Sequence, residues 1–293
     1  MISNPLFQGS AVALVTPFAN GKVDVPAIAR LVEFQLENGT AAILACGTTG
    51  EPATMTADER ELVVREVVRA VAGRVPVIAG TGTNNTQAVI DTANRYRGMG
   101  CAAQLVVTPY YNKTTQEGLY RHFMEIAEHT ELPIVVYNVP SRTTLDISPG
   151  VLERLAACEK FVGIKESSYN LPYIMEKVCA VQGRIPMYSG NDDMITPLMD
   201  LGGKGVISVI ANAFPRQVAD MAALHLAGNT AAALDLQLRL LPVIKAFFAE
   251  VNPIPCKAAM EMLGLCGGEL RLPLVPISES AKAQLQKALA PWA

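Results

Sequence analysis

Eight short apolar runs alternate with helix-like segments along the first two-thirds of the chain, and this alternation limits the possible folds more than any other feature. The runs are Ala11–Val15, Ala42–Cys46, Val75–Gly80, Gln104–Thr108, Ile134–Asn138, Phe161–Lys165, Met187–Ser189 and Val206–Ile210. The segments between them show helical periodicity and helix-start signals. Thr56–Glu59 and Thr114–Glu117 have the spacing of capping boxes, and Ser148-Pro149 is typical of a helix start. Eight strand–helix units of this length predict a (β/α)8 TIM barrel, an α/β fold.

An open, doubly wound sheet is the alternative for such an alternation. It would usually carry a glycine-rich phosphate turn after the first strand. Here Thr16-Pro17-Phe18 follows that strand and no GxGxxG occurs, which favours the barrel. From about Asn229 the strand pattern stops, and helices are expected over Thr230–Glu250, Pro255–Leu265 and Ser278–Leu289. We therefore predict a barrel domain over residues 1–228 and a C-terminal three-helix extension over residues 229–293.

Composition excludes several classes of function. Half of the 293 residues are hydrophobic, so a large core is available, and the net charge of −3 provides no basic surface for nucleic acid. No apolar run is long enough to span a bilayer, and the first residues lack the pattern of a secretory signal. The six cysteines form no CxxC pair and are expected to be reduced core thiols of a cytoplasmic protein. The three histidines lack metal-ligand spacing, so no metal is expected.

A lysine, Lys165, ends the sixth predicted strand, in the run Phe161-Val162-Gly163-Ile164-Lys165-Glu166-Ser167. In a barrel of this kind the active site lies at the carboxyl ends of the strands. Burial of a lysine favours the neutral amine, which is a nucleophile and can form a Schiff base with a carbonyl substrate. The alternative is a lysine that simply reaches water from a strand end.

Three further groups stand at predicted strand ends. Gly47-Thr48-Thr49-Gly50 offers backbone N–H groups and two hydroxyls that suit a carboxylate, although the same residues also make ordinary turns. Tyr137 ends the strand before that of Lys165 and could move protons near an imine, or could simply fill the barrel. Arg142 follows in a Pro-Ser-Arg-Thr loop, where its planar fork suits a carboxylate unless it is a surface group.

Taken together in this order, these segments resemble those of a known family. Gly47–Glu51, Tyr137–Thr143, Gly163–Ser167 and Val251–Lys257 resemble the motifs of the class I aldolase-like pyruvate lyases, and most closely those of the dihydrodipicolinate synthase family. The resemblance covers essentially the whole chain. It implies a Schiff-base condensation of pyruvate with aspartate 4-semialdehyde, in lysine and diaminopimelate biosynthesis, with no metal and no organic cofactor.

The resemblance also implies a role for each matching residue. Lys165 matches the imine-forming lysine and Tyr137 the tyrosine that shuttles protons. Thr48 and Thr49 match the pair that holds the pyruvate carboxylate, with Thr49 linking Tyr137 to a second tyrosine. Tyr111 matches that second tyrosine, which in the family reaches into the neighbouring subunit's site. The remaining matches are Arg142, for the acceptor carboxylate, and Gly190 and Ile207, whose carbonyls line the pyruvate pocket.

Other members of the same superfamily are the main alternative. N-acetylneuraminate lyases and keto-deoxy-sugar-acid aldolases share the lysine and the tyrosine. The lyases typically carry Ser-Thr in the carboxylate loop and lack the arginine, whereas this chain has Thr48-Thr49 and Arg142. A barrel that binds a keto acid without catalysis is a third possibility.

Assembly and regulation can also be predicted from the resemblance. The exposed-looking Tyr110-Tyr111 pair favours a homo-oligomer, with a tetramer built as a dimer of dimers. Many family members are inhibited by lysine bound at the tight-dimer interface. The matching positions here hold Pro52, Ala57, Arg60 and Ala88, while Asn84 and Tyr110 keep the family's residues. Because Arg60 adds a positive charge and Ala88 removes an anionic partner, weak or absent inhibition by lysine is expected.

Overall fold

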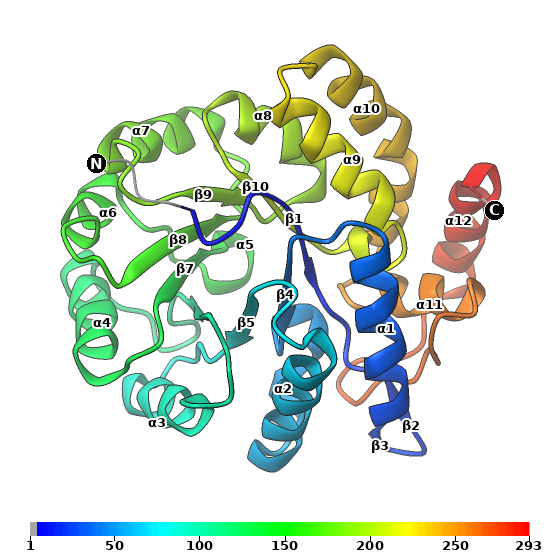
Figure 1. Ribbon diagram of the computed structural model, residues 1–293, viewed down its shortest axis with the longest axis horizontal. Coiled ribbons are helices and arrows are strands. Elements are labelled where there is room, and N and C mark those ends of the chain that lie inside the picture. Colours follow the sequence, from blue (N-terminus) through cyan, green and yellow to red (C-terminus); the bar gives the residue numbers. More distant parts are fainter. Residues whose placement is uncertain (1–4, 293) are drawn as a thin grey trace.

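Eight parallel strands close into a barrel, which confirms the predicted (β/α)8 fold (Figure 1). The computed structural model describes residues 5–292. Around the barrel the strands follow one another in chain order, and the last strand pairs with the first. They are β1 Gly9–Ala13, β4 Ala42–Ala45, β5 Val77–Gly80, β6 Ala103–Val107, β7 Ile134–Asn138, β8 Phe161–Glu166, β9 Met187–Ser189 and β10 Gly205–Ser208.

Helices surround the barrel, and three more follow it at the carboxyl end of the chain (Figure 1). Those up to α9 are α1 Val25–Glu37, α2 Ala57–Val71, α3 Thr86–Tyr96, α4 Gln116–His129, α5 Pro140–Thr143, α6 Pro149–Leu155, α7 Leu171–Val181, α8 Ile195–Asp200 and α9 Pro215–Leu226. The extension consists of α10 Thr230–Phe247, α11 Ile254–Met262 and α12 Glu279–Leu289. Every helix among residues 5–292 is too short or too polar to cross a bilayer.

Two of the three predicted helix starts are confirmed. Thr56 and Glu59 form a complete capping box at α2, and Ser148 caps α6. The predicted box at Thr114–Glu117 is wrong by one residue, because Thr115 is the cap of α4 and accepts from the N–H of Gly118. A glycine at this third helical position has no side chain to complete the box.

Alternation along the strands separates two apolar layers. Ala11 and Ala13 of β1 belong to the cluster inside the barrel, whereas Val12 between them packs under the surrounding helices. Small side chains recur in the interior cluster, which also includes Ala42 and Ala103. Because successive strand residues point to opposite faces, this register decides which residues at a strand end face the barrel axis.

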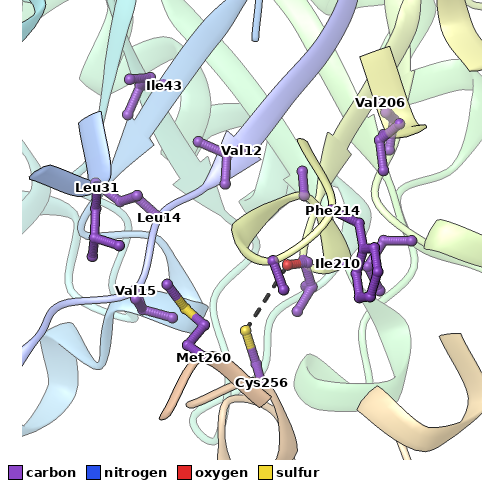
Figure 2. Close-up of a cluster of buried hydrophobic side chains, with 14 of the residues drawn as sticks. Val12, Leu14, Val15, Leu31, Ile43, Val206, Ile210, Phe214, Cys256 and Met260 are labelled. Atoms are coloured by element: carbon purple, nitrogen blue, oxygen red, sulfur yellow. Dashed lines mark hydrogen bonds between the residues drawn. The ribbon is translucent and has the colours of Figure 1, made fainter. Parts of the chain in front are cut away.

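The extension shares a core with the barrel. Cys256 and Met260 of α11 lie in one buried cluster with Leu14 and Val15, which follow β1 (Figure 2). The sulfur of Cys256 also lies 3.9 Å from the carbonyl oxygen of Val209, after β10. The helix α11 is therefore held against the strand ends by buried apolar contacts. The boundary at residues 228 and 229 stays a prediction.

Two features differ from the sequence-based expectation. A two-stranded hairpin, β2 Phe18–Ala19 and β3 Lys22–Val23, follows β1 and was not predicted. Its turn residues, Asn20 and Gly21, both have positive φ, and an Asn-Gly pair is the strongest local signal for such a turn. All six cysteines are free, but Cys179 is exposed on α7, so the prediction of a core thiol is wrong there.

Candidate active site

Lys165 and Tyr137 are direct neighbours across β7 and β8. The two residues pair in the strand register, and both side chains are buried, with 4% and 6% of their surface exposed. Tyr137 belongs to the cluster inside the barrel, so paired Lys165 faces the same interior. The Lys165 Nζ lies 4.5 Å from the centre of the Tyr137 ring. The structure thus brings together the amine and the phenol that were chosen from sequence.

A charged network behind this pair holds the two strand ends. Asn138 and Glu166 are the next residues along β7 and β8, and they point to the opposite face. The Asn138 amide donates to both oxygens of Glu166, and Lys177 of α7 lies 3.0 Å from Glu166 Oε2 and 2.5 Å from Asp146 Oδ1. Burial raises the pKa of Glu166, and the Lys177 ammonium opposes that shift. Breaking a buried ion pair of this kind typically costs about 3–5 kcal/mol, so the network fixes the register that aligns Tyr137 with Lys165.

The Thr48–Thr49 loop forms a short 3-10 helix, Thr48–Gly50, just beyond β4. Thr49 is buried, and its Oγ1 lies 3.0 Å from the side-chain amide of Asn252, in the C-terminal extension. The carbonyl of Gly50 accepts from the Thr16 hydroxyl at 2.7 Å. The loop is therefore tied to the segment after β1 and to the extension. Among the described residues, Thr49 forms no hydrogen bond with Tyr137 or Tyr111.

Gly190 and Ile207 lie at the neighbouring strand ends. Gly190 follows β9, and its N–H donates to the Glu166 carbonyl at 2.8 Å. A Cβ at Gly190 would lie 2.0 Å from the Ser167 hydroxyl and 3.0 Å from Lys165 Cε, so a side chain here would clash with Ser167 and crowd the lysine. Ile207 is buried inside the barrel on β10.

A cavity of about 350 Å³ opens at the carboxyl ends of β4, β5, β6 and β7. Thr48, Tyr137 and Arg142 all line it, together with Asn252 from the extension. Arg142 lies on the short helix α5 and donates to the Asn252 carbonyl at 3.3 Å. Lys165, Gly190 and Ile207 are not among its lining residues, and the Lys165 Nζ lies 4.5 Å from the centre of the Tyr137 ring. The cavity thus joins the expected carboxylate loop, the phenol and the guanidinium.

Tyr111 lies apart from this group within the single chain. Its side chain is 91% exposed, and its φ of 69° is in the left-handed region. A bulky residue in that region is uncommon and points to a functional constraint on the loop. The exposure is what a side chain that reaches into another subunit requires.

Asp192 is a buried residue that the sequence-based reasoning did not single out. It follows Gly190 by two positions and accepts from the Ser208 hydroxyl and from the N–H groups of Val209 and Ile210. Burial raises its pKa, whereas these hydrogen bonds and the charge of Lys165 oppose the shift. Asp192 therefore links the ends of β9 and β10, next to Ile207. An aspartate in the loop just beyond a strand end was the available signal.

Although the sequence predicts no metal, one group of side chains among the described residues could offer metal ligands. Glu125, Glu128 and His129 converge on the surface of α4. His122 of the same helix is buried, lies 2.9 Å from the Thr86 hydroxyl through Nδ1, and has its pKa lowered to about 4 by burial. It is a core histidine.

The closed barrel places the chain in the class of (β/α)8-barrel proteins, and a buried lysine lies at the end of one of its strands. Sequence comparison then gives the particular family. The profile of the Dihydrodipicolinate synthetase family matches residues 6–291, and the chain belongs to that family.

Relatives and solved structures agree with this assignment. A 4-hydroxy-tetrahydrodipicolinate synthase from Caldicellulosiruptor saccharolyticus is 49% identical over 97% of this chain and 97% of its own length. A dihydrodipicolinate synthase structure from Thermotoga maritima superposes with a TM-score of 0.96, at 44% identity over 98% of both chains. A structure described as a monomeric dihydrodipicolinate synthase variant, also 44% identical, gives 0.95 over 97% of this chain and 96% of that one.

Proposed function

We propose that this chain condenses pyruvate with L-aspartate 4-semialdehyde to give 4-hydroxy-tetrahydrodipicolinate, in lysine and diaminopimelate biosynthesis in the cytoplasm. The observation that carries the proposal is Lys165, buried at the end of β8 with its amine against the Tyr137 ring. Full-length similarity to proteins named 4-hydroxy-tetrahydrodipicolinate synthase supports it.

The proposed reaction begins when the Lys165 amine attacks the ketone carbon of pyruvate. Loss of water gives an imine, and removal of a methyl proton gives an enamine whose carbon attacks the aldehyde. Attack of the acceptor's own amine on the imine carbon closes the ring and releases Lys165. The protonated imine is the electron sink, so the reaction as proposed uses no metal and no organic cofactor.

The other groups have separate tasks in this proposal. Tyr137 moves protons to and from the imine, with Thr49 and Tyr111 extending its relay. Thr48 and Thr49 hold the pyruvate carboxylate, and the carbonyls of Gly190 and Ile207 line its pocket. Arg142 receives the acceptor carboxylate at the cavity.

Competing acceptors test the proposed function. Pyruvate should form a borohydride-trapped adduct, and aspartate semialdehyde should be consumed in its presence. Turnover of N-acetylmannosamine or a sugar aldehyde in place of the semialdehyde would indicate a lyase or an aldolase. A chain that traps pyruvate but turns over no acceptor would be a silent keto-acid binder.

Arg142→Ala should raise the Michaelis constant for aspartate semialdehyde by about one to two decades while leaving pyruvate imine formation largely intact. The reason is the loss of a charge-assisted contact worth about 1.5–3 kcal/mol. Steady-state kinetics with each substrate varied in turn measure the effect on the Michaelis constant of each substrate separately. Equal losses for both substrates would mean that Arg142 has a structural role.

Complementation between inactive chains should test the expected dimer. Tyr111→Phe and Lys165→Ala chains, mixed and refolded together, should regain activity, because one site in each heterodimer recovers both groups. The near-complete exposure of Tyr111 in the single chain supports this expectation. Activity that stays absent in heterodimers confirmed by mass spectrometry would rule out a shared site, as would a monomer in solution at working concentrations.

Lysine should inhibit the enzyme weakly or not at all. Pro52, Arg60 and Tyr110 line the same cavity as Thr48, and the Arg60 Nε is buried without a partner among the described residues. The positive charge of this guanidinium repels the ammonium groups of lysine. Initial rates measured with lysine up to the millimolar range check the prediction, and inhibition at submillimolar lysine would contradict it.

A further inference from the structure

Asn252 of the extension contacts two groups of the candidate site at once. Its side-chain amide donates to Thr49 Oγ1 at 3.0 Å, and its backbone carbonyl accepts from Arg142 at 3.3 Å. Asn252 is 6% exposed and Thr49 is 2% exposed, so water competes little for the bond between them. The residue therefore bridges the loop expected to hold pyruvate and the arginine expected to hold the acceptor.

A buried ion pair ties the same loop to α11. Lys257 Nζ lies 2.5 Å from Glu51 Oε1, and the side chains are 0% and 1% exposed. Lys257 also donates to the carbonyl of Glu269 at 2.8 Å. Burial lowers the pKa of Lys257, and the Glu51 carboxylate opposes that shift. Such a pair is strongly held, because either charge alone would be left unsolvated.

The backbone at Glu51 explains why an anchor is needed. Glu51 directly follows the Thr48–Gly50 turn and ends it with φ 54° and ψ 40°, in the left-handed region. A residue with a side chain persists there only when its surroundings enforce the conformation. The pair with Lys257 provides that enforcement one residue beyond the turn.

The helix α11 is held in place by buried apolar contacts, so it can serve as the anchor. Its Cys256 and Met260 are fully buried among Leu14, Val15 and other core residues (Figure 2). Asn252 precedes this helix by two positions, and Lys257 lies within it. The apolar cluster thus sets where both polar contacts are made.

From this arrangement we infer that Asn252 and Lys257 are positioning residues, through which the C-terminal extension sets the geometry of the Thr48–Thr49 loop for the carboxylate of pyruvate. The inference rests on the proposed function. Asn252 acts on Thr49 through its side chain, whereas its contact to Arg142 uses the backbone. Side-chain variants of Asn252 should therefore weaken pyruvate binding selectively.

The test uses the full-length enzyme. Asn252→Ala should raise the pyruvate concentration for half-maximal borohydride trapping about tenfold, which corresponds to one lost hydrogen bond. The Michaelis constant for aspartate semialdehyde should stay within about twofold, because the backbone contact to Arg142 remains. Asn212→Ala is the matched control: Asn212 is also buried, bonds to the backbone at Val15 and Ala13, and should lower Tm without a selective effect on pyruvate.

A double-mutant cycle tests whether Asn252 acts on pyruvate binding through Thr49. Thr49→Val combined with Asn252→Ala should weaken pyruvate trapping no more than Thr49→Val alone, because the two changes remove the same bond. Additive effects, or an unchanged pyruvate constant in Asn252→Ala, would overturn the inference. Lys257→Met should weaken pyruvate trapping and lower Tm together. If the Lys257→Met chain does not fold, the cycle of Thr49→Val and Asn252→Ala still tests the inference.

The outcomes separate this inference from the proposed function. A wild-type chain that forms no pyruvate adduct on Lys165 overturns both. A wild-type chain that forms the adduct and condenses the semialdehyde, with Asn252→Ala identical to it, overturns only the positioning role.

Discussion

Lys165→Ala should abolish the pyruvate-dependent adduct that borohydride traps in the wild-type chain. Without the amine no imine can form, so activity should fall by more than the about 10²–10⁴-fold that loss of one general acid–base group costs. Peptide mass mapping of the trapped wild-type enzyme should locate the reduced three-carbon adduct on Lys165 and on no other residue. The geometric basis is the amine enclosed at the end of β8, facing the barrel interior beside Tyr137.

Lys113→Ala is the matched control for this result. Lys113 is an exposed lysine in the loop after β6, close in sequence to Tyr111. Its replacement should leave both the adduct and the rate unchanged. An adduct found on Lys113, Lys204 or Lys257 would refute the assignment of Lys165, whatever the activity of the variants.

Tyr137→Phe should lower kcat by about 10²–10⁴-fold while the fold and the pyruvate pocket persist. The change removes only the hydroxyl and keeps the ring that lies 4.5 Å from the Lys165 amine. Because imine formation and enamine formation both need proton transfer, the trapping rate in a single turnover should slow as well. Rapid-quench trapping and steady-state kinetics together measure the two effects.

Tyr188→Phe provides a closely matched control. Tyr188 pairs with Lys165 on the other side, across β8 and β9, and is also buried inside the barrel. Its hydroxyl, however, donates to the Phe7 carbonyl at 2.9 Å and has no part in the proposed relay. This variant should lose about 0.5–1.5 kcal/mol of stability and keep its kcat. Equal catalytic losses in the two variants would show that a buried hydroxyl is needed only for packing.

Much of the fold could be predicted from sequence because its signals are local. Side-chain periodicity distinguishes the eight apolar runs of strand length from the helical segments between them. All eight of these runs form strands of the barrel. The positions of Lys165 and Tyr137 at strand ends follow from the same pattern. Errors arose where a local signal was overlooked, as at Asn20-Gly21, or placed one residue early, as at Thr114.

The barrel, its strand ends and the place of the Lys165 amine at one of them follow from local sequence patterns. The contacts that hold these groups in place form between segments that are far apart in the chain. Asn252 and Thr49 meet although 203 residues separate them, and Lys257 meets Glu51 in the same way. No local pattern encodes such contacts, because they depend on how α11 packs against the segments after β1 and β10. The physical reason is that burial and charge pairing act through space, so partners are chosen only once the chain has closed on itself.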